Sequence, residues 1–97
     1  MDRKLIEKLK ADLKQARVLR DGISIQNNYE VTGVSREGYL HPLISEVVLP
    51  RLHPHGLKVY YQKIVLALTE ALAYGTIEEN TLPRGAPKYL EDLLEAA

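Results

Sequence analysis

The chain has 97 residues, which is enough for one domain with a single core and too few for a separate catalytic domain beside a binding domain. Hydrophobic residues make up 45% of it and charged residues 27%, which disfavours disorder, and the absence of cysteine excludes disulfides, thiolate metal sites and cysteine nucleophiles. The formal net charge is zero, whereas a chain dominated by nucleic-acid binding is more often basic throughout.

A helix is predicted over about residues 2–20. Leu5, Leu9 and Leu13 recur at helical spacing, and Gly22 follows as part of a stop signal. The same segment concentrates positive charge, because residues 1–20 hold seven Lys or Arg against three acids, a local balance of +4. Any hypothesis of polyanion binding therefore depends on this segment.

Residues 23–34 fit either a small hairpin or short helical turns. Ile23 and Ile25 alternate with polar residues, as in a strand, yet Ile25 and Tyr29 also lie four apart, as on one side of a helix. We favour an irregular segment with helical turns and keep a small β element near residues 23–34 as the alternative.

A second helix is predicted over about residues 42–52. Pro42 suits a first helical turn and several apolar residues after it form a buried side, while Pro50 predicts a kink or an early end. The tetrapeptide His-Pro-His-Gly at 53–56 then predicts a corner, in which Gly56 permits the reversal into the next helix.

The most apolar helix is predicted from Leu57 to about residue 74, with Gly75 as its stop signal. Its apolar side chains cover more than one side, which is typical of a central helix or of one that faces a second subunit. Thr76 and Glu79 have the spacing of a capping box and predict a short turn.

The C-terminal part is predicted as a loop over 82–87 followed by a last helix. Proline and glycine mark the loop, Pro87 opens the helix, and we expect its apolar residues to point inward; these are Leu90, Leu93, Leu94 and Ala97. The predicted fold class is all-α: a single domain over residues 1–97, built as a compact bundle of about four helices. No apolar run approaches the roughly 20 residues of a membrane span, so we expect a cytoplasmic protein.

The histidines are the obvious candidates for metal ligands, but they are too few. A zinc site needs three or four ligands, and His53 and His55 supply two. A helix over 42–52, rising about 1.5 Å per residue, would put His41 roughly 16 to 18 Å from His53. We predict no metal and no cofactor, and keep His53 and His55 as a weak alternative in which a two-fold dimer pairs them with their symmetry mates.

A basic stripe lies along one border of the apolar side of the helix over 2–20. It consists of Arg3, Lys10, Lys14 and Arg17. These long side chains could bind phosphates, cover the edge of the core, or pair with the acidic last helix within the chain or across a dimer. A solvated or internally paired surface is the commonest outcome for such charges.

A degenerate helix-turn-helix at residues 27–43 is a further hypothesis. Gly33 lies where such a turn needs a glycine, and the helix after it would present Arg36 to base edges. Gly38 inside that helix, and Pro42 at its end, count against this interpretation.

All six aromatic residues are tyrosine, which suits half-buried rims and interfaces. Tyr60 and Tyr61 cannot both point at the same core from one helix, so we expect one of them on a groove or a subunit contact and place the partner-binding surface on them together with Val65 and Leu72. The alternative is that they are ordinary tyrosines at the edge of the core.

No enzyme motif occurs in the chain, and we predict a non-catalytic protein-interaction or regulatory module, an adaptor or subunit that acts by self-association as a homodimer and by binding an unknown protein partner. The alternative is a nucleic-acid-binding transcriptional regulator that uses the basic stripe or Arg36.

Overall fold

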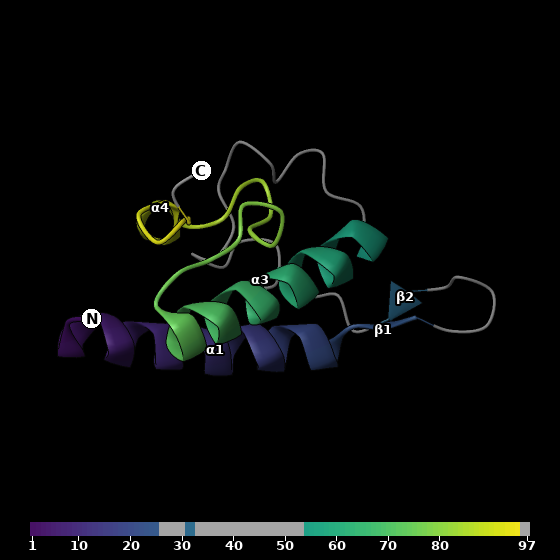
Figure 1. Ribbon diagram of the computed structural model, residues 1–97. Helices are drawn as coiled ribbons and strands as arrows, with labels where there is room; N and C mark the ends of the chain where they lie inside the picture. Colours follow the sequence, from purple (N-terminus) through teal and green to yellow (C-terminus); the bar gives the residue numbers. More distant parts are fainter. Residues whose placement is uncertain (26–30, 33–53, 96–97) are drawn as a thin grey trace.

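The computed structural model of the chain describes residues 1–25, 31–32 and 54–95. Two long helices, α1 (Arg3–Gly22) and α3 (Pro54–Tyr74), lie side by side and run in opposite directions (Figure 1). A short helix, α4 (Lys88–Glu91), follows near the C-terminus. The all-α class is confirmed at this level. The helix expected over 42–52 lies outside the described residues, and so does the helix-turn-helix expected over 27–43, except for Val31 and Thr32, which are in a strand.

Helix α1 follows its prediction closely. Asp2 caps its first turn, where the carboxylate accepts a hydrogen bond of 3.2 Å from the backbone N–H of Lys4. Its buried side consists of Leu9, Leu13 and Ala16, which recur at three- and four-residue spacing. The apolar periodicity therefore predicted both the helix and the side that packs.

A short β-hairpin with two residues in each strand follows α1. The preference for helical turns in this stretch is therefore wrong, and the alternative of a small β element is confirmed. Strand β1 (Ser24–Ile25) pairs antiparallel with β2 (Val31–Thr32), with Ser24 opposite Thr32 and Ile25 opposite Val31. Ile23 is buried in extended conformation directly after the helix, so the chain enters the strand at once. The alternating pattern prevailed over the four-residue spacing of Ile25 and Tyr29.

Helix α3 begins earlier than predicted. Pro54 is its first residue. Proline lacks an N–H, but the N–H groups of the first turn have no partner within a helix, so no hydrogen bond is lost there. Gly56 lies within this first turn. The predicted reversal at Gly56 is therefore wrong, because Gly56 is already part of the helix. The predicted end is confirmed: Gly75 has φ +76°, and its N–H donates to the carbonyl oxygen of Ala71 at 2.9 Å.

The last helix is shorter than predicted, because the chain leaves it to pair with an earlier segment. Ile77 and Leu94 form an isolated parallel bridge, in which the Ile77 N–H donates to the Leu93 carbonyl (2.7 Å) and the Glu95 N–H donates to the Ile77 carbonyl (2.8 Å). Leu90 is fully buried, and Leu93 and Leu94 pack against the core as partly buried residues. The expected inward position of Ala97 lies outside the described residues.

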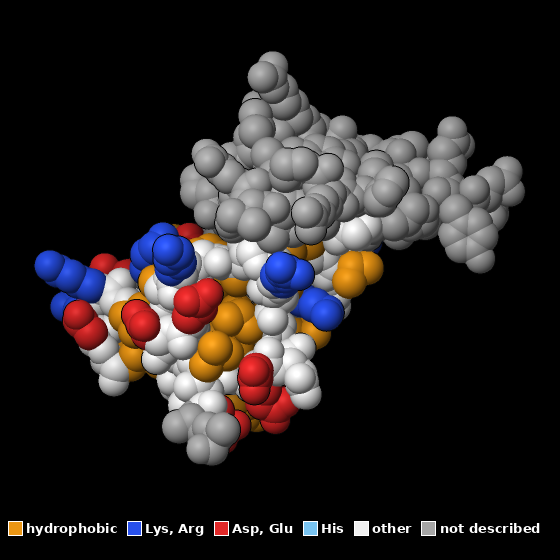
Figure 2. All heavy atoms as spheres, turned by 90° about the horizontal axis from the view of Figure 1, so that it is seen from above, with side chains coloured by type: hydrophobic (Ala, Val, Ile, Leu, Met, Phe, Trp, Pro, Cys, Tyr) orange, Lys and Arg blue, Asp and Glu red, His pale blue; other side chains and the backbone are white. Residues whose placement is uncertain are grey.

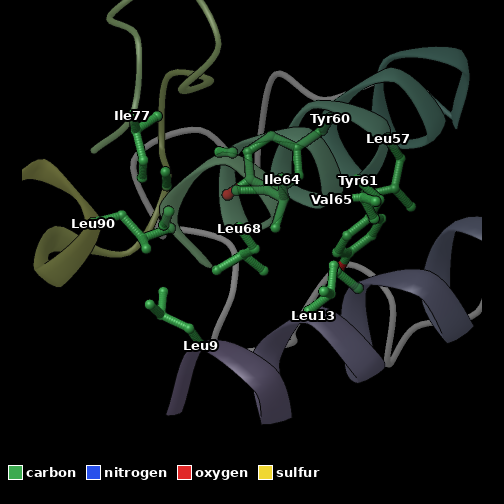
Figure 3. Close-up of a cluster of buried hydrophobic side chains, with 14 of the residues drawn as sticks. Leu9, Leu13, Leu57, Tyr60, Tyr61, Ile64, Val65, Leu68, Ile77 and Leu90 are labelled. Atoms are coloured by element: carbon green, nitrogen blue, oxygen red, sulfur yellow. The ribbon is translucent and has the colours of Figure 1, made fainter. Parts of the chain in front are cut away.

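The core lies between α1, α3 and the C-terminal segment, whose labelled side chains point toward one another in Figure 3. Helix α3 supplies most of it, so it is the central helix. Fully burying one such side chain contributes about 1.5–3 kcal/mol. The buried residues are Leu9, Leu13, Ala16, Ile23, Leu57, Tyr60, Tyr61, Ile64, Val65, Ala67, Leu68, Ala71, Ile77, Ala86 and Leu90.

None of the helices in the described part of the chain is both long enough and apolar enough to cross a membrane.

Candidate functional site

The residues predicted to bind a partner lie in the core or against it. Tyr60 is 4% exposed, Tyr61 0% and Val65 6%, and Leu72 is partly buried against the core. Their role in partner binding stays a prediction, but a partner could reach the three buried side chains only if the core opened. Successive residues on a helix point about 100° apart, and both tyrosines are nevertheless inside because α3 is buried over a wide arc.

The hydroxyl of Tyr60 is satisfied by the loop predicted over 82–87. It donates a hydrogen bond of 3.0 Å to the carbonyl oxygen of Gly85. Gly85 has φ +93°, and the Ala86 N–H donates to the Pro83 carbonyl at 3.3 Å, which closes a tight turn. Burial, and secondarily the neighbouring Tyr61, raise the pKa of Tyr60, so this side chain is a neutral core residue.

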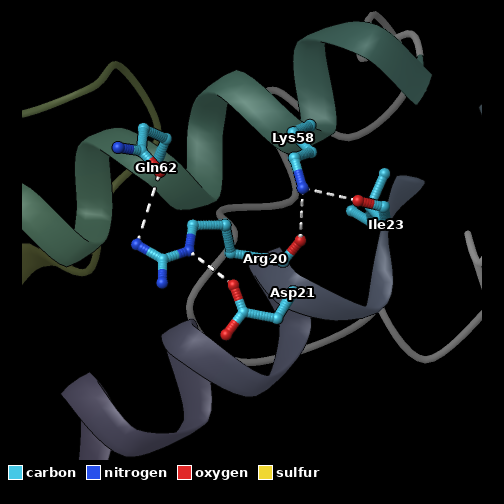
Figure 4. Close-up of polar contacts among 5 residues, drawn as sticks. All are labelled: Arg20, Asp21, Ile23, Lys58 and Gln62. Carbon is cyan, nitrogen blue, oxygen red and sulfur yellow. Dashed lines mark hydrogen bonds and ion pairs between the residues drawn. The ribbon is translucent and has the colours of Figure 1, made fainter. Parts of the chain in front are cut away.

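A lysine of α3 holds the C-terminal end of α1 (Figure 4). The Lys58 ammonium donates to the carbonyl oxygens of Arg20 at 3.0 Å and Ile23 at 2.5 Å. Carbonyls at a helix end lack partners within the helix, and the helix dipole favours a cation there. Arg20 extends the contact, since its guanidinium donates to Asp21 and to Gln62 of α3. No local sequence signal marks Lys58 for this role.

A second polar cluster joins α1 to α4. Asp12 accepts a hydrogen bond from the Tyr89 hydroxyl, and the Lys8 ammonium lies 3.2 Å from the Asp12 carboxylate. The same ammonium lies 4.9 Å from the centroid of the Tyr89 ring, a cation–π distance. Burial, and then the hydrogen bond to Asp12 and its charge, raise the pKa of Tyr89. These groups hold the C-terminal segment in place.

The basic stripe of α1 is exposed along its whole length. Arg3 lies 3.5 Å from the Glu7 carboxylate in an exposed pair. Among the described residues, no carboxylate pairs with Lys10, Lys14 or Arg17. We call these three residues the basic face. Arg36, the fifth predicted polyanion ligand, lies outside the described residues.

An acidic pocket lies where segments distant in sequence meet. It has a volume of about 290 Å³ and is lined by Glu70, Tyr74, Thr76, Glu78 and Glu95. The parallel bridge between Ile77 and Leu94 brings Glu78 beside Glu95. The sequence alone did not indicate this pocket, because the long-range bridge is what brings Glu95 to the segment that holds the other lining residues.

Glu70 also shapes the turn after α3. Its carboxylate accepts hydrogen bonds of 3.0 Å from the Glu78 N–H and from the Thr81 hydroxyl. A short turn follows Thr76, as predicted, and the Thr81 N–H donates to the Glu78 carbonyl in it. The side chain that accepts hydrogen bonds from this turn is Glu70 of the preceding helix. In the described ranges, none of the three glutamates that line the pocket forms an ion pair.

Figure 2 shows acidic and basic side chains interspersed around an area of hydrophobic ones on one side of the molecule.

The described residues contain no group of three or more His, Cys, Asp or Glu side chains that could hold a metal ion. His41 and His53 lie outside them. His55 lies in the first turn of α3, but its side chain is not described. The weak alternative of a histidine site across a dimer therefore stays a prediction.

No family model, no curated protein and no solved structure matches this chain.

Proposed function

We propose that the chain is a non-catalytic interaction module that binds an acidic partner through the basic face of α1. One observation carries the proposal: the three cations are exposed and have no carboxylate partner among the described residues. The neighbouring cations Lys8 and Arg20 do have such partners. A row of lysine and arginine side chains binds by charge and needs no reactive group.

The geometry of α1 supports this role. Lys10, Lys14 and Arg17 are four and three residues apart, so at a rise of about 1.5 Å per residue their Cα atoms span roughly 10 Å of the helix. The adjacent side of the helix is fixed in the core by Leu9 and Leu13. The row is therefore held on a rigid backbone, which lowers the entropy lost on binding.

The energy scale sets the kind of binding we expect. An exposed ion pair contributes about 0.2–1 kcal/mol, so three of them supply only about 0.6–3 kcal/mol. Such a surface binds weakly and sensitively to salt unless further contacts or a second copy of the site reinforce it. The expected partner is a protein surface that is rich in carboxylates.

Nucleic acid is the second candidate, favoured by the same row of exposed cations. Three phosphate contacts would make the logarithm of the affinity for duplex DNA fall with the logarithm of salt concentration with a slope of about −2.7. The even balance of 13 bases and 13 acids favours the protein partner, since the chain as a whole does not attract a polyanion.

Capture on the immobilised chain from an extract of its source cells tests the proposal. The variant Lys10→Glu, Lys14→Glu, Arg17→Glu removes the basic face. The matched control, Lys4→Glu, Lys63→Glu, Lys88→Glu, makes the same change in charge at exposed lysines elsewhere. We expect the wild type and the control to retain the same acidic protein and the basic-face variant to lose it, with circular dichroism showing that all three chains are folded.

Nuclease treatment separates the two candidates, because a bound species that disappears with nuclease indicates nucleic acid. Equal capture by the wild type and the basic-face variant would contradict both.

A further inference from the structure

We infer that the acidic partner of the basic face is a second copy of this chain, which presents its acidic pocket. This inference rests on the proposed function and names the occupant of the same surface. Each copy carries both halves of the contact. The basic face of one copy meets the pocket of the other, and the reverse contact forms at the same time around a two-fold axis.

Charge complementarity is the first argument. The basic face holds three cations, and the pocket is lined by the carboxylates of Glu70, Glu78 and Glu95. Within the described residues of one chain, no ion pair joins the two surfaces. A second copy neutralises both sets at once, in a chain whose net charge is already zero.

The lining of the pocket is the second argument. Its volume of about 290 Å³ equals that of roughly ten waters of the liquid, at about 30 Å³ each, and so admits the end of a long side chain. Tyr74 also lines it and is 79% exposed, so its ring is accessible to a cation beside the carboxylates. A lysine or arginine end would find both kinds of contact there.

Two-fold symmetry is the third argument. One contact between exposed charges is weak, but the second contact of a two-fold dimer forms between chains that are already joined, so its effective concentration is high. Because the contact is electrostatic, its range shrinks as the Debye length falls from about 30 Å at 0.01 M salt to about 8 Å at 0.15 M. A phosphate backbone fits less well, since the carboxylates of the same chain repel it.

Sedimentation of the purified 97-residue chain, from micromolar to millimolar concentration and at both salt levels, is the primary test. We expect a monomer–dimer equilibrium that weakens at least tenfold at the higher salt. The basic-face variant and the pocket variant Glu78→Lys, Glu95→Lys should each be monomeric. The pocket variant leaves Glu70 in place because its carboxylate holds the turn after α3.

Mixing the variants shows whether these two surfaces touch each other. In a mixed dimer of the basic-face variant and the pocket variant, one contact has reversed signs and the other is the native one, so both are attractive and the mixture should form a one-to-one dimer. The Lys4, Lys63, Lys88 control variant has the same net charge as the basic-face variant but restores only one contact, so it should bind the pocket variant at least tenfold more weakly. Equal affinities would mean that net charge alone drives the association, which would overturn the inference.

A cross-linking measurement on the wild type keeps the test independent of the variants. A carbodiimide joins amines directly to carboxylates in contact, and a mixture of ¹⁴N- and ¹⁵N-labelled chains identifies links between copies. We expect links from Lys10 or Lys14 to Glu78 or Glu95. Links between copies at other positions only, or a wild type that stays monomeric at millimolar concentration and low salt, would overturn the inference. If that monomer still captured an acidic protein through its basic face, the proposed function would stand.

Discussion

Lysines on two sides of α1 differ in their contacts: one side faces α4 and the other is the basic face. Lys8 is paired with Asp12 and lies over the ring of Tyr89, so it belongs to the contact between α1 and α4. Lys10 is two residues further along and, like Lys14, has no carboxylate partner among the described residues. The difference arises because the C-terminal segment returns to one side of the helix only. A charged side chain is structural where the chain returns to meet it, and is available to a partner where the chain does not.

Substitution on the buried side of α1, which lies between these two sides, should change the free energy of unfolding the most. Leu9→Ala removes a fully buried side chain, so we expect the free energy of unfolding to fall by about 2–5 kcal/mol. Val18→Ala on the exposed side of the same helix should change it by less than about 0.5 kcal/mol. Urea unfolding followed by circular dichroism measures both, and comparable losses would contradict the placement of α1.

The next effect is at the junction of α1 and α3. Lys58→Met keeps much of the side chain but removes the hydrogen bonds to the carbonyls of Arg20 and Ile23, so we expect a loss of about 1–2 kcal/mol. Lys63→Met, at an exposed position of the same helix, is the matched control and should be nearly neutral. A neutral result for Lys58 would show that water replaces its bonds without cost.

The paired side of α1 can be broken at the hydroxyl of Tyr89. Tyr89→Phe keeps the ring under Lys8 but removes the hydrogen bond to Asp12, and should cost about 1 kcal/mol near neutral pH. Tyr74→Phe, at an exposed ring, is the control. Asp12→Asn, combined with Tyr89→Phe in a double-mutant cycle, isolates the energy of the pair.

The same tyrosine gives a pH dependence. Its pKa is raised above the usual value of 10, so above that pH the unfolded chain loses a proton that the folded chain retains. The stability that this group contributes is fully present below pH 10 and is lost as the pH rises through the folded pKa. The alkaline decline in stability should therefore be shallower in Tyr89→Phe than in the wild type, with Tyr60 and Tyr61 supplying the remainder. Equal slopes would contradict the burial of this hydroxyl.

The unpaired side should show the smallest effect on stability. Lys10→Gln, Lys14→Gln, Arg17→Gln should change the free energy of unfolding by less than about 0.5 kcal/mol at 0.15 M salt, because no described carboxylate loses a partner. Thermal unfolding of dilute protein measures this. A loss above 1 kcal/mol would show that the basic face supports the fold.

Local periodicity was enough to predict the long helices and the end of α3. Leu9, Leu13 and Ala16 repeat on one side of α1, and Gly75 takes the positive φ that ends α3. The start of α3 was missed by a few residues because His-Pro-His-Gly looks like a corner, whereas proline is also a good first residue of a helix.

What the sequence did not predict depends on contacts between distant segments. The bridge between Ile77 and Leu94 shortens the last helix and assembles the acidic pocket, and no local pattern marks either partner. Tyr60 and Tyr61 were placed at an interface because one core could not receive both, but α3 is buried over a wide enough arc to take both. The basic stripe was visible from spacing, whereas which of its members remain unpaired was not.

The separation of these contacts along the chain also sets a time scale during synthesis. Lys58 closes on Arg20 across 38 residues, and Tyr89 closes on Asp12 across 77. At about 5–20 residues per second, roughly 2 to 8 seconds pass between the synthesis of the end of α1 and the arrival of Lys58, and roughly twice as long before Tyr89 follows Asp12. For those seconds α3, against which Leu9 and Leu13 pack in the folded chain, has not yet been synthesised, so the nascent chain carries the apolar side of α1 before that partner exists.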